Sequence, residues 1–383
     1  MRIGPAVASE RASSPRRSRA SLLADLAAAP ESTTLRVDGH PVALTHLDRV
    51  YWPASADPRQ APITKRDLLR YLVEVAPRML PHLRDRPLTL FRWPEGIGGR
   101  RVLEKHWEMT LPPFVERVDV FSDSKGHRDQ YLLCNNVATL VWLAHMGTLE
   151  FHAWHSRVRT GPDAPGAGGD FAGSADALEA SVLERPDYVL FDLDPFIYSG
   201  HEAKGREPSF NPAAFAKAAN VARELEAMLA GIGLDAFVKT SGKTGLHVIV
   251  PIERTLRFDA VREMARFIGD RLMRAHPQDI TLDWEVRKRT GKVFVDANMN
   301  VRGKSMTAPL SPRGLPGAPV SMPLSWDELD EANPRDFRIT TVPGLLAKRG
   351  DAWRGWLAHA QRVEDVLAGD AGAPERARAE HRR

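Results

Sequence analysis

An apolar run that contains two aspartates, DYVLFDLDP at residues 187–195, constrains the fold of this chain more than any other segment. Its β-branched and aromatic residues predict a strand over 187–194. Side chains two apart on a strand share a face, so Asp192 and Asp194 are expected to project together. Paired carboxylates repel each other unless a cation joins them, and such oxygen ligands suit Mg²⁺ or Mn²⁺. Pro195 is expected to end the ladder and to place the pair at a strand end.

A second strand is predicted at 292–296, where KVFVD places Asp296 after another apolar run. Three carboxylates from two strands can hold two divalent ions about 3.5–4 Å apart, which is the arrangement used in nucleotidyl transfer. A DxD motif alone also occurs in sugar transferases, in phosphatases and in plain turns, so these alternatives stay open. A haloacid-dehalogenase-like phosphatase is disfavoured, because Pro195 and Phe196 stand where that class has Thr or Val.

Strands and helices alternate along the chain, which predicts an α/β or α+β fold rather than an all-β one. The expected elements are, in order, a helix capped by Thr64, a strand at 86–93, a helix capped by Asn136, a strand at 149–154, a Gly/Ala/Pro-rich loop at 161–175, a helix from Asn211 and Pro212 to Gly231, strands at 237–240 and 246–251, and a helix capped by Asp259. Three regions are expected, namely a disordered basic arm at 1–34, one folded domain at 35–345, and a C-terminal helix with a basic tail at 346–383.

Composition limits the setting in which the chain works. The 383 residues are 43% hydrophobic and 27% charged, as is usual for a globular protein. No run of about 18 apolar residues and no secretory signal occurs, so no membrane association is expected. Cys134 is the only cysteine, which excludes disulfides within one chain and fits a reducing cytoplasm. The net charge of +4 is compatible with nucleic acid but does not require it.

The segment KTSGKTGLHVIVP at 239–251 lies between the two aspartate strands and has the residues of an anion-binding turn. Its glycines allow a tight bend that exposes N–H groups, while Ser241 and Lys243 add donors. His247 is expected to face the same side as the carboxylates, where it and Ser241 would donate to triphosphate oxygens. The alternative is a hairpin turn with a hydrogen-bonded core histidine, which is the more common meaning of a lone His. The Walker A pattern is absent.

Basic and polar residues gather on both sides of Asp296. They are Arg287, Lys288, Arg289 and Lys292 before it, and Asn300, Arg302, Lys304, Ser311 and Arg313 after it. Arginine can clamp phosphate oxygens, so these clusters could follow a nucleic-acid backbone, although a solvated face is the more common meaning. His152 and Trp154 share a face of their predicted strand, where they could contact a base or sugar; core packing of Trp154 is the alternative.

Together these motifs resemble the archaeo-eukaryotic primase superfamily, and within it the polymerase domain of bacterial ligase D, the non-homologous end-joining enzyme. Three superfamily motifs occur in order, namely DLD at 192–194, SGKTGLH at 241–247 and Asp296. The flanks are similar as well, namely RPLTLFRWPEG at 86–96, LEKH at 103–106, ATLVWLAHMGTLEFH at 138–152, RPDYVLFDLDP at 185–195 and SMTAPLSPRGLPGAPVSMPLSWDEL at 305–329. The resemblance extends over about residues 40–345.

The resemblance implies an α+β primase-like fold, in which an RNA-recognition-like catalytic sheet faces a second sheet with flanking helices. It implies a template-using DNA/RNA polymerase that extends 3′ ends and fills gaps at DNA breaks. A two-metal mechanism with Mn²⁺ or Mg²⁺ and a ribonucleotide preference are implied too. The substrates would be NTPs or dNTPs and DNA with 5′-phosphorylated gaps or ends. Ku and a separate DNA ligase would be partners, and the location would be the nucleoid in the cytoplasm.

The resemblance also assigns roles to individual residues. Catalytic metal ligands match Asp192, Asp194 and Asp296; nucleotide contacts match Ser241, Lys243, His247, Arg313 and His152; and a lysine that binds a 5′ phosphate across a break matches Lys65. The partner of that lysine is Arg49 here, and Val102 and Leu103 stand where relatives often have paired Phe. The loop at 161–180 is longer than usual, and the ligase motif KxDG is absent, so a ligase would have to act in trans.

Two further hypotheses compete with the end-joining polymerase. A replicative-type primase would make dinucleotides without a primer, and the 5′-phosphate residue Lys65 argues against it. A catalytically silent module that binds DNA ends would act without metal, and the three intact carboxylates disfavour it.

Overall fold

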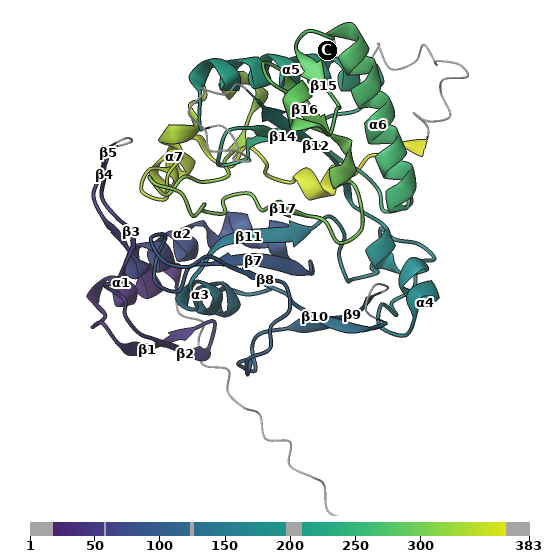
Figure 1. Ribbon diagram of the computed structural model, residues 1–383. Coiled ribbons are helices and arrows are strands. Elements are labelled where there is room, and N and C mark those ends of the chain that lie inside the picture. The colour runs from purple at the N-terminus through teal and green to yellow at the C-terminus, as the bar shows by residue number, and fades with distance from the viewer. Residues whose placement is uncertain (1–17, 57–58, 123–125, 197–208, 365–383) are drawn as a thin grey trace, which may run out of the picture.

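The computed structural model describes residues 18–56, 59–122, 126–196 and 209–364, which form two lobes (Figure 1). A four-stranded sheet lies in the lobe that contains the N-terminal half of the chain, and a six-stranded sheet lies in the other. Among the helices of the described residues, none combines the length and apolar character that crossing a bilayer requires.

The six-stranded sheet carries the aspartate strands. In spatial order its strands are β15 (Ile280–Thr281), β16 (Val293–Asp296), β12 (Tyr188–Pro195), β14 (Leu246–Pro251), β13 (Phe237–Thr240) and β18 (Pro323–Leu324). Neighbouring strands are antiparallel except β15 and β16. Helix α5 (Pro212–Gly231) connects β12 to β13, and α6 (Phe258–Ala275) follows β14. The four central strands and these helices therefore follow the order strand–helix–strand–strand–helix–strand.

Strand β12 shows how the sequence sets the two faces of this sheet. Phe191 and Leu193 are fully buried in the core that includes α5 and α6. Asp192 and Asp194 alternate with them and lie half-buried on the opposite face. The helices therefore cover one face of the sheet, and the aspartates lie on the other.

The four-stranded sheet contains β17 (Ser305–Thr307), β11 (Thr148–Trp154), β7 (Leu88–Arg92) and β8 (Val102–Glu104), in that spatial order. The helices of this lobe are α1 (Arg19–Ala28), α2 (Lys65–Leu83) and α3 (Val137–His145). Strand pairs around it are β1 (Thr33–Val37) with β2 (His40–Leu44), β3 (Val50–Trp52) with β6 (Ile63–Thr64), β4 (Ser55–Ala56) with β5 (Arg59–Gln60), and β9 (Arg117–Ser122) with β10 (His127–Leu132). Outside both sheets lie α4 (Ala175–Glu179), α7 (Val342–Arg349) and short 3-10 turns.

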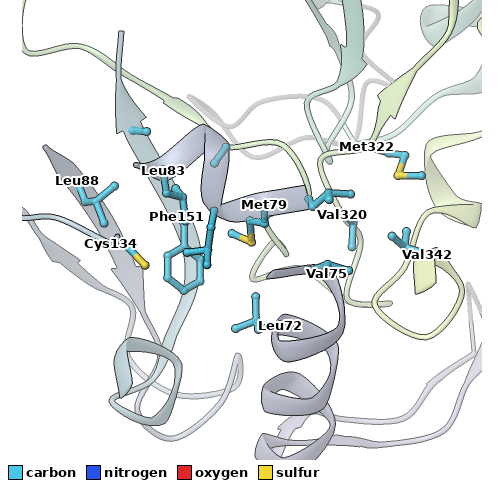
Figure 2. Close-up of a cluster of buried hydrophobic side chains, with 14 of the residues drawn as sticks. Leu72, Val75, Met79, Leu83, Leu88, Cys134, Phe151, Val320, Met322 and Val342 are labelled. Atoms are coloured by element: carbon cyan, nitrogen blue, oxygen red, sulfur yellow. The ribbon is translucent and has the colours of Figure 1, made fainter. Parts of the chain in front are cut away.

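Helix α2 joins the two lobes through a shared hydrophobic core (Figure 2). Figure 2 shows Val75 and Met79 of α2 between Phe151 of β11 and Val320 of the C-terminal segment. All four side chains are almost completely buried, and each such burial stabilises the fold by roughly 1.5–3 kcal/mol. The C-terminal segment also crosses between the sheets, since β17 pairs with β11 and β18 pairs with β13. The C-terminal segment therefore links the two sheets.

Most of the expected elements are confirmed. Thr64 caps α2 with a reciprocal bond to Asp67, and Asn136 and Asn211 cap α3 and α5 through their side chains. The strands expected at 86–93, 149–154, 187–194, 237–240, 246–251 and 292–296 correspond to β7, β11, β12, β13, β14 and β16.

Four expectations were wrong. Helix α1 lies inside the arm expected to be disordered at 1–34, because Ser18 caps it and Leu22 and Leu26 are buried. Residues 1–17 and 365–383, which carry the rest of the arm and tail, lie outside the described residues. Asp259 sits in the first turn of α6, and Arg257 occupies the cap without a side-chain bond. The C-terminal helix α7 starts at Val342, before the expected boundary at 346.

The fourth correction concerns Pro195, which does not end the strand. Pairing of β12 with β14 stops at Leu193, but pairing with β16 continues to Pro195, opposite Val293. Proline lacks only the N–H donor, so it is tolerated where one side of a strand is already unpaired.

Candidate active site

Three carboxylates lie on the face of the six-stranded sheet that α5 and α6 leave uncovered. Asp192 on β12 and Asp296 on β16 are direct partners across the ladder, and Asp194 stands two residues farther along the same face, opposite Phe294. Asp296 is nearly buried and the side chain of Asp192 is only 17% exposed. The structure thus places Asp192 and Asp296 side by side and Asp194 on the same sheet face, and their joint role as metal ligands stays a prediction.

The charges of this group oppose one another. Burial and the neighbouring Asp192 carboxylate raise the pKa of Asp296 above its usual range. Burial alone would also raise the pKa of Asp192, but His247, Lys239 and Arg313 outweigh it and lower that pKa. Asp192 therefore carries the more stable negative charge, and a divalent cation between the two strands would relieve the repulsion.

Carboxylate oxygens are the ligands that a hard divalent cation prefers, but these side chains are not grouped around one point. Oδ1 of Asp192 is buried without a hydrogen-bond partner, and Oδ1 of Asp296 accepts the N–H of Asn298. In the part of the chain that the structure describes, no three His, Cys, Asp or Glu side chains are grouped as a metal site. Asp192 and Asp296 are adjacent across the ladder, and Asp194 follows two residues after Asp192 on the same face.

A row of polar side chains crosses the sheet at the level of Asp192. Lys239 on β13 pairs with His247 on β14, His247 pairs with Asp192, and Asp192 pairs with Asp296. His247 Nε2 lies 3.4 Å from Asp192 Oδ1. Burial and the nearby Lys239 lower the pKa of His247 to about 4, so the imidazole is neutral at pH 7 and can donate only one N–H. Lys239 is fully buried, and its Nζ donates to Ser321 Oγ at 2.5 Å.

The turn between β13 and β14 lies beside this row and is held by its own hydrogen bonds. Ser241 Oγ accepts the N–H groups of Lys243 at 3.2 Å and Gly245 at 3.1 Å. Gly242 has a φ of 76°, and a Cβ on Gly245 would lie 2.3 Å from the carbonyl oxygen of Leu193. Glycine is therefore required for the turn to approach β12 so closely. The hairpin alternative therefore describes the geometry correctly, and binding of an anion by this turn stays a prediction.

Arg313 and His152 face the six-stranded sheet from the other lobe. Arg313 Nη1 donates to the carbonyl oxygen of Ser241 at 3.1 Å and to Thr307 Oγ1. Glu150 lies between the two, with Oε2 at 3.2 Å from His152 Nε2 and 3.4 Å from Arg313 Nη2. Burial raises the pKa of Glu150, but Arg313 and His152 outweigh it and bring that pKa to about 2. Glu150 is thus a permanent carboxylate that orients both side chains.

Lys65 and Arg49 form a second cationic group. The family resemblance pairs these two residues, and the structure has them next to each other. The Lys65 N–H donates to the carbonyl oxygen of Arg49 at 2.9 Å, Nζ donates to that of Thr45 at 3.0 Å, and Nζ lies 5.6 Å from the centre of the Tyr51 ring. Burial, together with the charge of Arg49, lowers the pKa of Lys65 to about 8. Two cations this close, one of them desolvated, suit a phosphate.

Some residues singled out in the sequence have structural roles instead. Asn300 is fully buried and bonds both the N–H and the carbonyl group of Leu190. Arg302 pairs with Glu184, and Trp154 is buried against Tyr131. Conversely, Glu150, Thr307 and Lys239 belong to the site and were missed; for Glu150 the available signal was its place two residues before His152 on one strand face.

Comparison with known proteins identifies the family. Residues 64–353 match the family described as LigD, primase-polymerase domain. Curated relatives include the multifunctional non-homologous end joining proteins LigD of Pseudomonas aeruginosa and Mycobacterium bovis, which are 31% and 32% identical over 313 residues. Each alignment covers 81% of this chain but only 33% and 36% of the relative, so the chain spans about a third of their length.

A solved structure agrees with the sequence comparison. The polymerase domain from Mycobacterium tuberculosis ligase D, in complex with DNA, matches with a TM-score of 0.68 and 31% sequence identity, over 84% of this chain and 99% of that one. The chain therefore belongs to the family of LigD primase-polymerase domains, which are DNA nucleotidyltransferases.

Proposed function

We propose that this protein is a template-using DNA/RNA polymerase that extends 3′ ends and fills gaps at DNA breaks during end joining. The observation that carries the proposal is the in-register row from Lys239 through His247 and Asp192 to Asp296, with the Ser241 turn beside it. On one sheet face it sets carboxylates that would bind cations beside side chains that would donate to phosphate. The solved relative with bound DNA supports nucleic acid as the substrate.

Asp192, Asp194 and Asp296 would hold two divalent ions, Mn²⁺ or Mg²⁺, which supply charge stabilisation of the attacking and leaving oxygens. In the transfer, the 3′ oxygen bonds to the α-phosphorus, the bond from that phosphorus to the bridging oxygen breaks, and pyrophosphate leaves. The hydroxyl proton passes to water. The six-stranded sheet would then be the RNA-recognition-like catalytic sheet of the primase fold.

Ser241, Lys243, His247 and Arg313 would bind the triphosphate on the β13–β14 side of the carboxylates. The neutral His247 can donate one hydrogen bond, and the Arg313 guanidinium can donate two to neighbouring phosphate oxygens. His152, held by Glu150, would lie against the nucleotide from the other lobe. The ribonucleotide preference of the proposal rests on family resemblance and awaits a direct comparison of NTPs with dNTPs.

Lys65 and Arg49 would bind the 5′ phosphate on the far side of a gap. Leu103 is 52% exposed at the position where relatives often have Phe, so stacking on a template base would be weaker here. Ku and a separate ligase are proposed partners, and the place of action would be the nucleoid in the cytoplasm.

Primer extension on a gapped duplex tests the proposal. The substrate carries a 5′ phosphate at the gap, and the reaction contains Mn²⁺ and NTPs. Wild-type protein should add nucleotides to the 3′ end, and Asp192→Ala should lose at least about 1000-fold in rate, because a shared metal ligand is gone. Asp176→Ala on α4 is the matched control, since this aspartate is exposed and outside the site. No extension by wild type, or full extension by Asp192→Ala, would overturn the proposal, and synthesis without a primer would indicate a primase instead.

A further inference from the structure

Trp284 is the most exposed large hydrophobic residue of the described chain, with 67% of its surface open to solvent. It lies in the connection between β15 and β16, and Val286, 52% exposed, follows it. Tryptophan is usually well buried, and an exposed one costs free energy that a ligand can recover.

The ring of Trp284 is fixed in place although it is exposed. The Arg289 guanidinium lies 5.2 Å from its centre and also contacts the rings of Phe294, at 3.5 Å, and Phe196, at 5.0 Å. Arg289 Nη2 donates to the carbonyl oxygen of Trp284 at 2.6 Å, and Nε donates to that of Asp283 at 2.8 Å. Arg289 itself is only 6% exposed. Because this support is already formed, a ligand that stacks on Trp284 loses little free energy to ordering the ring.

The group sits directly beside the carboxylates. Phe196 comes two residues after Asp194, and Phe294 comes two residues before Asp296 on β16. Residues two apart in an extended chain point to the same side. Phe294 is the ladder partner of Asp194. The aromatic support of Trp284 therefore begins where the row of carboxylates ends.

Trp284 and the phosphate donors lie on opposite sides of β12. His247 and the Ser241 turn are on the β14 side, whereas Phe294 and Arg289 are on the β16 side. In an in-line displacement the attacking and leaving oxygens lie on opposite sides of the phosphorus. If pyrophosphate leaves toward β14, the strand that supplies the 3′ hydroxyl approaches from the side of Trp284.

The charge around Trp284 favours nucleic acid over a protein partner. Residues 283–292 contain four basic side chains, at 287, 288, 289 and 292, and two acidic ones, at 283 and 285. The excess of two positive charges suits phosphates, and one exposed ring with one exposed valine is a small apolar surface for a protein interface.

We propose that Trp284 is a stacking platform for an unpaired base of the strand being extended, close to its 3′ end. The ligand class is single-stranded DNA, as at a 3′ overhang, and the inference rests on the proposed polymerase function. The base stacks on the open part of the ring while Arg287 and Lys288 lie near the phosphates. Double-stranded primers, whose bases are already stacked, gain less from this contact.

Binding measurements without catalysis test the platform. A fluorescent single-stranded oligothymidylate of about 12 nucleotides is titrated with protein, and anisotropy gives the dissociation constant. Trp284→Leu, which keeps an apolar side chain but removes the aromatic face, should weaken binding roughly 5- to 100-fold. Trp284→Phe should retain most of the affinity. Phe267→Ala is the matched control, because this exposed aromatic lies on α6, in the helix layer behind the sheet, and its loss should change nothing.

The outcomes separate this inference from the proposed function. Equal affinity of Trp284→Leu and wild type, or equal losses for Trp284→Leu and Trp284→Phe, would overturn the platform, and the former result would point to a protein partner for this surface. Primer extension on the same variants adds a second readout, in which Trp284→Leu should impair extension of a 3′ overhang more than extension of a recessed duplex end. A wild type that binds through Trp284 but never extends a primer would refute the polymerase and leave the platform standing.

Discussion

Replacing Asp296 by Asn is expected to stabilise the metal-free protein and to remove its response to Mn²⁺. Asp296 faces Asp192 directly across the β12–β16 ladder, and burial together with the Asp192 charge raises its pKa. With an effective dielectric constant of about 20 and a separation of about 5 Å, two such charges repel by on the order of 3 kcal/mol, and solvent screening leaves roughly 1–3 kcal/mol. Asn keeps the oxygen that accepts the N–H of Asn298, so the local turn is retained.

Thermal unfolding with and without Mn²⁺ measures both effects. In EDTA the Asp296→Asn midpoint should exceed that of wild type by a few degrees. Mn²⁺ at about 1,000 times its dissociation constant should stabilise wild type by about 4.1 kcal/mol and the variant by much less, so the order of stability reverses. Asp176→Asn on α4 should match wild type in both conditions to within about 0.5 kcal/mol. A variant that is less stable than wild type in EDTA, and that gains as much from Mn²⁺, would refute the reasoning.

Three further predictions follow from other parts of the site. The pKa of Lys65 is about 8, so its positive charge, which a bound phosphate favours, is present below that pH. The affinity for 5′-phosphorylated ends, measured in an anisotropy titration, should therefore fall above pH 8 by up to about tenfold per pH unit. Lys65→Arg should remove this fall. Glu150→Gln should raise the NTP KM in steady-state kinetics roughly tenfold, with a smaller change in kcat, because Arg313 and His152 lose a charged hydrogen-bond partner. Gly245→Ala should lower kcat about 100-fold, because its Cβ would push on the backbone beside Asp194.

Each of these predictions has a control and an outcome that contradicts it. For Lys65, DNA with a 5′ hydroxyl should bind with little dependence on pH, and parallel pH curves for the two DNAs would count against a phosphate site. For Glu150, a drop in kcat at constant KM would mean that the carboxylate does not orient the nucleotide contacts. For Gly245, the control is Gly231→Ala at the end of α5, where an added Cβ meets no atom within 4 Å. Equal activity of both variants would mean that catalysis does not depend on the close approach of the β13–β14 turn to β12.

Local patterns predicted the elements of the site well. Two aspartates two residues apart in an apolar run must share a strand face, and the structure has them so. Capping side chains at Thr64, Asn136 and Asn211 marked helix starts correctly because each bond is local. Helix α1 was missed although Ser18 and the spacing of Leu22 and Leu26 signalled it, because the surrounding Arg, Ala and Ser suggested a disordered arm.

What depends on pairing between distant segments could not be predicted from local pattern. The register that sets Asp296 opposite Asp192 joins positions about a hundred residues apart and comes from the packing of β16 on β12. Glu150 and Lys239 look like ordinary surface charges in the sequence. Both are buried in the fold, where Lys239 bonds to Ser321 from a distant segment of the chain. Family resemblance supplied the roles of Lys65 and Arg49, and their proximity is the structural support for that pairing.

Anomalous diffraction from crystals grown with Mn²⁺ and a non-hydrolysable NTP tests the central claim most directly. We expect manganese peaks between β12 and β16, each within about 2.0–2.2 Å of an oxygen of Asp192, Asp194 or Asp296, with the triphosphate at Ser241 and His247. Manganese bound elsewhere, with the three aspartates free of metal, would contradict the account.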